Sequence, residues 1–380
     1  ISAKKYTDFS HTYKIITFMM LVGFQYPKPE LHRARTVAFI FMLLSVTPVC
    51  IFVFIDIYKS ILVKNFVTVI RHCTIVGPFL AIFFKIIIMH IKEKTAMQII
   101  NEINRDYELF NTMSPSYQEI IDASIANSLQ YSEKGWAITV LCVVLIFPLM
   151  AAVLNVYNFT FKSEPAKYMV HDLPKPYGEP EERFDTPYFE IMFVYMVYCA
   201  ALYIVNFVGY DGFFGLCINH ACLKMQLYCQ AFKEALASEN MYEKIVGVIK
   251  EQNRLFKYVD LIQDTFNVWL GLILIATMIQ ICNCMYHITE GYELDLRYII
   301  FITGTIIHIY LPCRYSAKLK YMSVETATLF YISGWEHVNN IPIRKMVLFM
   351  IARAQVPLEI TAFNKMIFDM DLFVSVCNFL

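Results

Sequence analysis

The stretch GWAITVLCVVLIFPLMAAVLNVYNFTF, residues 135–161, decides the fold class of this chain. It runs for 27 residues without a single Asp, Glu, Lys or Arg. A helix needs roughly 20 mostly apolar residues to cross the hydrocarbon core of a bilayer, where it also satisfies its own backbone hydrogen bonds. We therefore predict that this stretch spans a membrane as a helix.

Five further segments have the same character. Residues 36–55, 191–210, 265–289 and 298–313 also lack Asp, Glu, Lys and Arg. Residues 65–91 carry Arg71 and Lys85, but each lies one or two turns from an end, so both side chains can snorkel to an interface. The six predicted spans are residues 36–57, 65–91, 135–158, 188–210, 265–289 and 297–313.

The composition of the whole chain agrees with this class. Of its 380 residues, 58% are hydrophobic and 17% charged, whereas soluble domains are about 45–50% apolar and about 25% charged. This excludes a disordered chain and argues against a soluble enzyme. The net charge is zero, which gives a nucleic-acid partner no support. The eleven cysteines are absent from the loop around residues 158–187, so the chain is not a disulfide-stapled ectodomain.

The orientation follows from the positions of Lys and Arg. One set of loops and termini carries 22 of these residues and the other set carries seven. Because basic residues concentrate in cytoplasmic loops, the N-terminus is predicted to be cytoplasmic, and a seventh span would leave the C-terminus outside. G-protein-coupled receptors have the opposite orientation, and their Asp-Arg-Tyr and Asn-Pro-x-x-Tyr motifs are missing here. The sequon at Asn158 falls in an outer loop, where glycosylation and a chance match are equally good readings.

Two regions of the chain are expected to lie outside the membrane on the cytoplasmic side. Residues 211–264 and 314–355 are predicted to be amphipathic helices that form a cytoplasmic anchor region, packed either within the chain or against another subunit. Residues 1–210 and 265–313 form the transmembrane domain. Gly209, Gly212 and Gly215 recur at steps of three and favour either close approach of another helix or a bend. The proline-rich outer loop 162–187 is predicted to be an irregular surface loop or a lid.

Motifs for catalysis are missing from the sequence. There is no Walker A loop, no His-Glu-x-x-His and no Gly-x-Ser-x-Gly, so we expect neither an enzyme nor a cofactor. Cys282 and Cys284 lie in an apolar span, where packing as small hydrophobes is a better interpretation than metal binding.

The outer halves of four spans carry apolar and aromatic side chains that would line a pocket if the helices converge. Such a pocket suits a small hydrophobic ligand, while each residue taken singly is better read as facing lipid or packing helices. The candidate ligand-binding residues are Cys73, Thr74, Gly77, Phe147, Met150, Ala151, Leu154, Phe193, Met196, Val197, Phe301 and Thr305.

The C-terminal third carries a recognisable signature. Residues 329–335 read LFYISGW, residues 350–358 read MIARAQVPL with Thr361 and Ala362 after them, and residues 370–376 read MDLFVSV. This pattern resembles the C-terminal signature of insect odorant receptors. The length, the seven-span plan and the cytoplasmic N-terminus are similar to that family over the whole chain.

The resemblance implies an all-α polytopic fold with seven transmembrane helices and a function in olfaction. The chain would bind a small hydrophobic odorant or pheromone and gate a non-selective cation channel as a tetramer with a co-receptor subunit. It would reside in the plasma membrane of olfactory sensory neurons. Residues 211–264 look too short for the co-receptor itself, so a tuning subunit is implied.

In that family the last helix lines the pore. Residues 366–380 would be its start, with Val376 and Leu380 facing the pore. Residues 372–380 are apolar but too few to cross a bilayer. A last helix that is cut short is the favoured interpretation, ahead of a re-entrant segment.

The alternative function is transport of a small solute across the membrane. It predicts an internal repeat and broken helices in corresponding halves of the chain. The six clear spans differ in length and in their flanking residues, so neither feature is found.

Overall fold

The computed structural model describes residues 5–162, 166–177, 179–290 and 296–379. These residues fold almost entirely into helices, with a single short hairpin, β1 (Thr361–Ala362) and β2 (Met366–Ile367), near the C-terminal end. The predicted all-α class is therefore confirmed.

Among the described residues, six helices are long and apolar enough to cross a membrane. They contain α3 (His32–Leu62), α4 (Phe66–Ile91), α7 (Trp136–Phe161), α8 (Tyr188–Leu236), α9 (Met241–Glu290) and α10 (Leu296–Tyr331). The six predicted spans lie along these helices in order. Large apolar side chains such as Val37, Phe41 and Leu44 of α3 are exposed, as expected of a surface that faces lipid.

Local sequence explains where several helices begin. The carboxylate of Asp8 accepts from the backbone N–H of His11 and caps α1 (Phe9–Thr12). Asn65 caps α4 by accepting from the N–H of Thr68, and Asn340 caps α11 (Ile341–Ala354). Pro115 occupies the first turn of α6 (Pro115–Asn127), where no backbone donor is needed.

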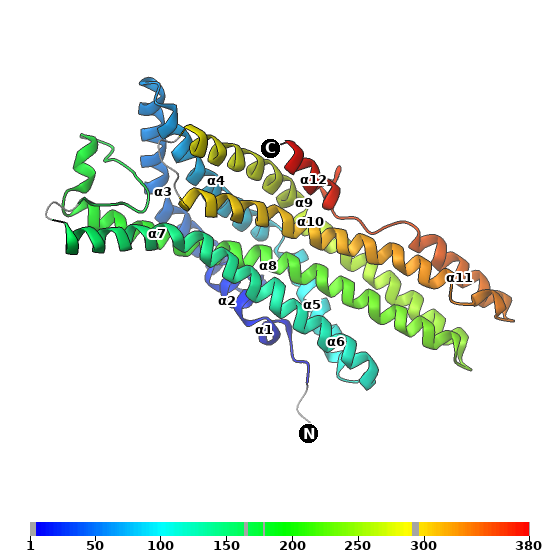
Figure 1. The fold of residues 1–380 in the computed structure, drawn as a ribbon. Coiled ribbons are helices and arrows are strands. Elements are labelled where there is room, and N and C mark those ends of the chain that lie inside the picture. Colours follow the sequence, from blue (N-terminus) through cyan, green and yellow to red (C-terminus); the bar gives the residue numbers. More distant parts are fainter. Residues whose placement is uncertain (1–4, 163–165, 178, 291–295, 380) are drawn as a thin grey trace.

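Helices α8, α9 and α10 reach far beyond the membrane. A helix of 49 residues such as α8 is about 74 Å long at 1.5 Å per residue, against about 30 Å of hydrocarbon. Figure 1 shows these three helices running side by side and projecting past α3 and α4. The loop between α7 and α8 lies at one end of the molecule, called the outer end here, and α11 lies at the inner end.

The inner region is completed by shorter helices around the projecting ends of α8 and α9. They are α1, α2 (Lys14–Val22), α5 (Glu93–Phe110), α6, the π-helical segment η2 (Ser128–Gly135) and α11. Apolar residues of α5 recur every three or four positions, and Ile99, Ile103, Tyr107 and Phe110 are all buried. This periodic face joins α5 to the core. The remaining short elements are the 3₁₀ segments η1 (Pro29–Leu31), η3 (Pro180–Phe184) and η4 (Trp335–His337), and α12 (Met370–Phe379).

The glycine series on α8 marks close helix contacts. A Cβ at Gly212 would lie 2.7 Å from Ile16 Cδ1 of α2, and one at Gly215 would lie 2.9 Å from the ring of Tyr315 on α10. Gly209 likewise faces Met20. The predicted close approach of other helices is confirmed, and the absence of a side chain is what permits it.

Candidate ligand pocket and charged clusters

A cavity of about 110 Å³, called the outer cavity here, lies in the outer half of the helix bundle. Residues of α4, α7, α8 and α10 line it, together with two residues of the outer loop, Val170 and His171. Its lining is almost entirely apolar and aromatic. Buried apolar surface provides affinity for a small hydrophobic ligand without fixing its exact shape.

Four of the twelve candidate residues line this cavity, namely Thr74, Phe147, Met196 and Phe301. Two others lie deeper: Gly77 and Thr305 both line a second cavity of about 40 Å³, called the inner chamber here. The structure thus brings half of the predicted set together around two adjoining spaces.

The other six candidates lie outside both spaces. Ala151 is buried and Phe193 half-buried, and both belong to an apolar cluster between α3, α7, α8 and the outer loop. Val197 is exposed on the outer surface of α8, where it faces lipid. Cys73, Met150 and Leu154 are half-buried and do not line either cavity. Ala151 and Leu154 lie one and two turns beyond Phe147 on the same face of α7, so they miss the cavity by depth, whereas Val197 lies on another face of α8 than Met196.

The cavity lining includes residues that were not predicted from the sequence. Among them are Val143, Val144, Cys199, Tyr203 and Tyr298. All belong to the predicted spans and lie three, four or seven residues from a predicted lining residue, so the missing information was the depth of the cavity along each helix. His171 could not be found in this way, because it comes from a loop without helical periodicity.

A chain of hydrogen bonds joins the outer loop to the bundle. His72 Nε2 lies 2.5 Å from Asp56 Oδ2, and His72 Nδ1 lies 2.9 Å from His171 Nε2. Burial, together with the charges of His72, Arg71 and Arg297, lowers the pKa of His171 well below its usual value, so it is neutral. The contact links α3, α4 and the loop above the cavity.

Salt bridges add to this attachment. Asp172 of the loop binds Arg71 of α4 at 3.1 Å and Arg183 of η3 at 2.9 Å. Arg71 therefore does reach the outer interface, as predicted. The loop is held over the cavity by several polar contacts, as a lid would be.

Lys85 behaves differently from the prediction. Its side chain is fully buried, and its ammonium group lies 2.6 Å from Asp211 Oδ2 on α8. Snorkelling to an interface was the wrong expectation, because a buried carboxylate 126 residues away neutralises the lysine in place. Asp211 also accepts from Trp269 Nε1 and His308 Nε2. This cluster, called the charged floor here, ties α4, α8, α9 and α10 together below the cavity.

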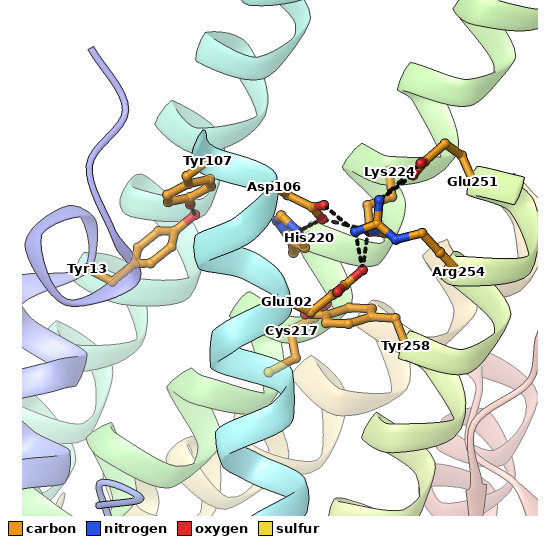
Figure 2. A network of polar contacts seen from close by, with 10 residues as sticks. All are labelled: Tyr13, Glu102, Asp106, Tyr107, Cys217, His220, Lys224, Glu251, Arg254 and Tyr258. Carbon is orange, nitrogen blue, oxygen red and sulfur yellow. Dashed lines mark hydrogen bonds and ion pairs between the residues drawn. The ribbon is translucent and has the colours of Figure 1, made fainter. Parts of the chain in front are cut away.

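A second charged cluster lies in the inner region, outside the membrane. Figure 2 shows Glu102 and Asp106 of α5 facing Lys224 of α8 and Arg254 of α9. Asp106 contacts Lys224 at 2.6 Å, His220 at 2.9 Å and Arg254 at 3.1 Å. The sequence had indicated amphipathic helices here but not this cluster.

The ionisation of this cluster is set by its own contacts. Burial alone would raise the pKa of Asp106, but the hydrogen bond and charge of His220 and the charge of Lys224 outweigh it and lower that pKa to about 2. Burial lowers the pKa of His220, and this outweighs the opposite effect of its hydrogen bond to Asp106. Asp106 is therefore an ionised carboxylate that binds two cations and holds three helices together.

The remaining predicted sites have distinct surroundings. Val376 of α12 is buried against the main core, whereas Leu380 lies outside the described residues. Asn158 is buried, and its Nδ2 donates to the carbonyl of Ala166. Within the described residues, His32, His90 and Glu93 could together hold a metal ion, but Arg35 already binds Glu93. That group serves as an ion-pair cluster, and we assign no metal to it.

The sequence matches a known protein family. A family model described as 7tm Odorant receptor covers residues 65–380. Odorant receptor 13a of Drosophila melanogaster is 22% identical over 207 residues, 49% of this chain and 50% of that protein. Odorant receptor 10 of Aedes albopictus is 23% identical over 217 residues, 53% of this chain and 57% of that protein. The chain spans about half the length of the curated relatives it matches.

The fold also matches a solved structure. The insect olfactory receptor OR5 from Machilis hrabei, solved in complex with eugenol, superposes with a TM-score of 0.74 at 14% identity. The superposition covers 97% of this chain and 94% of that one. This similarity establishes a shared fold, and the family model covers most of the chain. The chain is therefore a multi-pass membrane protein that belongs to the insect odorant receptor family, a family of receptors rather than enzymes.

Proposed function

We propose that this chain is the tuning subunit of an odorant-gated cation channel, and that it binds a small hydrophobic volatile in the outer cavity. The observation that carries this proposal is the apolar cavity of about 110 Å³ under a loop held by His171 and Asp172. A catalytic site would need convergent polar groups, which this lining does not provide. A receptor must bind its ligand, and an apolar cavity of this kind can hold a small hydrophobic one.

The gating route starts at α10. This helix contributes Tyr298 and Phe301 to the cavity wall, and further along it Tyr310 packs against Phe373 of α12, with ring centroids 5.2 Å apart. A ligand that fits one position of α10 better than another shifts the population of states toward that position. Coupling of this kind is typically about 1–3 kcal/mol per site. Because α12 is the proposed start of the pore helix, its movement with α10 opens the channel.

The proposed partner is a co-receptor subunit in a tetramer. Large apolar side chains are exposed at the inner end of α10 and on α11, including Tyr331, Ile332 and Phe349. Exposed apolar patches outside a membrane favour an interface with another chain. The proposed location is the plasma membrane of olfactory sensory neurons, where such a channel converts odorant binding into current.

The test is expression in a cell without native odorant receptors, with and without a co-receptor subunit. We expect an inward cation current evoked by a hydrophobic volatile only when both subunits are present. Cells that express the co-receptor alone provide the control for direct effects of the volatiles. Saturable solute uptake by this chain alone, with no current in the pair for any volatile, would contradict the proposal and favour a transporter.

A further inference from the structure

The inner chamber lies directly below the outer cavity. The two spaces share Pro78, Tyr203 and Phe301 as a common wall. The chamber measures about 40 Å³, which exceeds the roughly 10–15 Å³ that one water molecule requires. It therefore has room for a small end group of a ligand whose body lies in the outer cavity.

Three polar groups on residues that line the chamber have no hydrogen-bond partner among the described residues. The hydroxyl groups of Tyr203 and Thr277 make no hydrogen bond to any residue in the described part of the chain, and neither does Gln280 Oε1. Thr277 and Gln280 are at least nine-tenths buried. Unpaired polar groups at membrane depth cost free energy unless something binds to them.

A hydrogen bond from its amide nitrogen fixes the orientation of the Gln280 side chain. Its Nε2 donates to the backbone carbonyl of Thr74 at 3.0 Å, and a carbonyl can only accept. The oxygen must then lie on the other side, where a Cβ built on Gly77 would come within 3.0 Å of it. Because Gly77 has no side chain, there is room at the chamber wall for the Gln280 oxygen, which can only accept hydrogen bonds.

This set of groups selects among ligand end groups. A hydroxyl group donates to Gln280 Oε1 and accepts from Thr277 or Tyr203, so it satisfies both kinds of partner. An ether, ester or ketone oxygen accepts but leaves Gln280 Oε1 unpaired, and a hydrocarbon satisfies none of them. A carboxylate would need a cation, but Asp211 already neutralises Lys85, which lies below the chamber.

We propose that the inner chamber is a recognition subsite for a hydroxyl group, and that the ligand is a small alcohol or phenol with an apolar body. This inference rests on the proposed function, because it assigns the ligand class of the same pocket. The apolar cavity supplies affinity, and the chamber supplies specificity for the end group.

The first test measures binding without gating. Of the three tryptophans in the sequence, Trp269 lines the chamber, so its emission reports occupancy. The purified chain is titrated with octanol, its isomer heptyl methyl ether and nonane, and then with other primary alcohols and phenols beside their methyl ethers. We expect the better-fitting alcohols to bind about 10-fold more tightly than their ethers, which is the usual effect of one lost hydrogen bond. Equal affinities for alcohols and ethers throughout would overturn the subsite while leaving the proposed function intact. If no member of the series bound at all, the proposed function itself would fail.

The second test removes the acceptor. Gln280→Met keeps a side chain of similar length but lacks the oxygen, and we expect it to reduce the preference for alcohols to about twofold with ether binding unchanged. Gln252→Met is the matched control, because Gln252 is a buried glutamine on the same helix in the inner region, far along α9 from the chamber. Gly77→Ala should act in the same direction by displacing the Gln280 oxygen. An undiminished preference in folded Gln280→Met protein would overturn the assignment of Gln280.

Discussion

The charged floor leads to a prediction about stability. If the ion pair between Lys85 and Asp211 is broken, the two charged groups are left with different numbers of other partners. Lys85 is fully buried and has one carboxylate partner, Asp211. Without it, the ammonium group retains only aromatic neighbours, with the ring centroids of Phe207 at 3.2 Å and Trp269 at 4.7 Å. Asp211 has three donors, Lys85, Trp269 and His308, and loses one of them if the lysine is removed. The two single substitutions should therefore differ in cost.

Asp211→Asn leaves an uncompensated buried charge, and removal of one partner from a buried pair typically costs about 3–5 kcal/mol. Lys85→Met leaves a carboxylate that still accepts two hydrogen bonds, each worth about 1.5–3 kcal/mol to a charged group. We therefore expect Lys85→Met to be about 2 kcal/mol less destabilising than Asp211→Asn. The double variant should be close to Lys85→Met, because the charge left over in Asp211→Asn is then absent.

Thermal unfolding in detergent, followed with a thiol-reactive dye, provides the measurement. Six of the eleven cysteines are buried and become reactive on unfolding. The predicted order of melting temperatures is wild type, then Lys85→Met and the double variant, then Asp211→Asn. If Asp211→Asn melted at the same temperature as Lys85→Met or above it, the reasoning about unequal partners would be refuted.

Three further predictions concern other parts of the molecule. The pKa of Asp106 is about 2, against the ordinary value of 3.8, and this difference corresponds to about 2 kcal/mol of stability. That stability is present above pH 4 and is lost as the pH falls toward 2. Asp106→Asn should therefore remove this part of the pH dependence of the melting temperature. Gly304→Ala should lower the melting temperature by several degrees, because its Cβ would lie 2.4 Å from Val143 Cγ2, whereas Gly247→Ala on an open helix face should not. His171→Ala should increase hydrogen exchange in residues 166–177, since the loop loses one of its polar contacts with the bundle, and unchanged exchange would contradict a holding role for this side chain.

The membrane helices could be predicted from local sequence because each one is decided by a local property. Uninterrupted apolar runs such as residues 135–161 leave a helix across the bilayer as the satisfactory solution for the backbone. The glycine spacing on α8 was equally informative, because Gly212 and Gly215 lie on faces that other helices approach closely. In both cases the information is contained in neighbouring residues.

The pocket and the charged clusters could not be predicted to the same extent because they depend on the depth and rotation of each helix and on distant partners. Met196 lines the cavity and Val197, the next residue, faces lipid, although both looked equally suitable in the sequence. Lys85 looked like a snorkelling residue because nothing local indicates that Asp211 lies beside it. His171 came from a loop whose prolines predicted irregular structure but not its path over the cavity.

The most direct test of the central claim is to fill the outer cavity. Ala200 lines the cavity, whereas Ala201, the next residue on α8, is exposed on the lipid-facing surface. We predict that Ala200→Phe, co-expressed with the co-receptor at normal surface levels, loses the odorant-evoked current of the wild type. Ala201→Phe should retain that current with an unchanged half-maximal concentration. A wild-type odorant response in Ala200→Phe would show that the ligand does not bind in this cavity and would contradict the account.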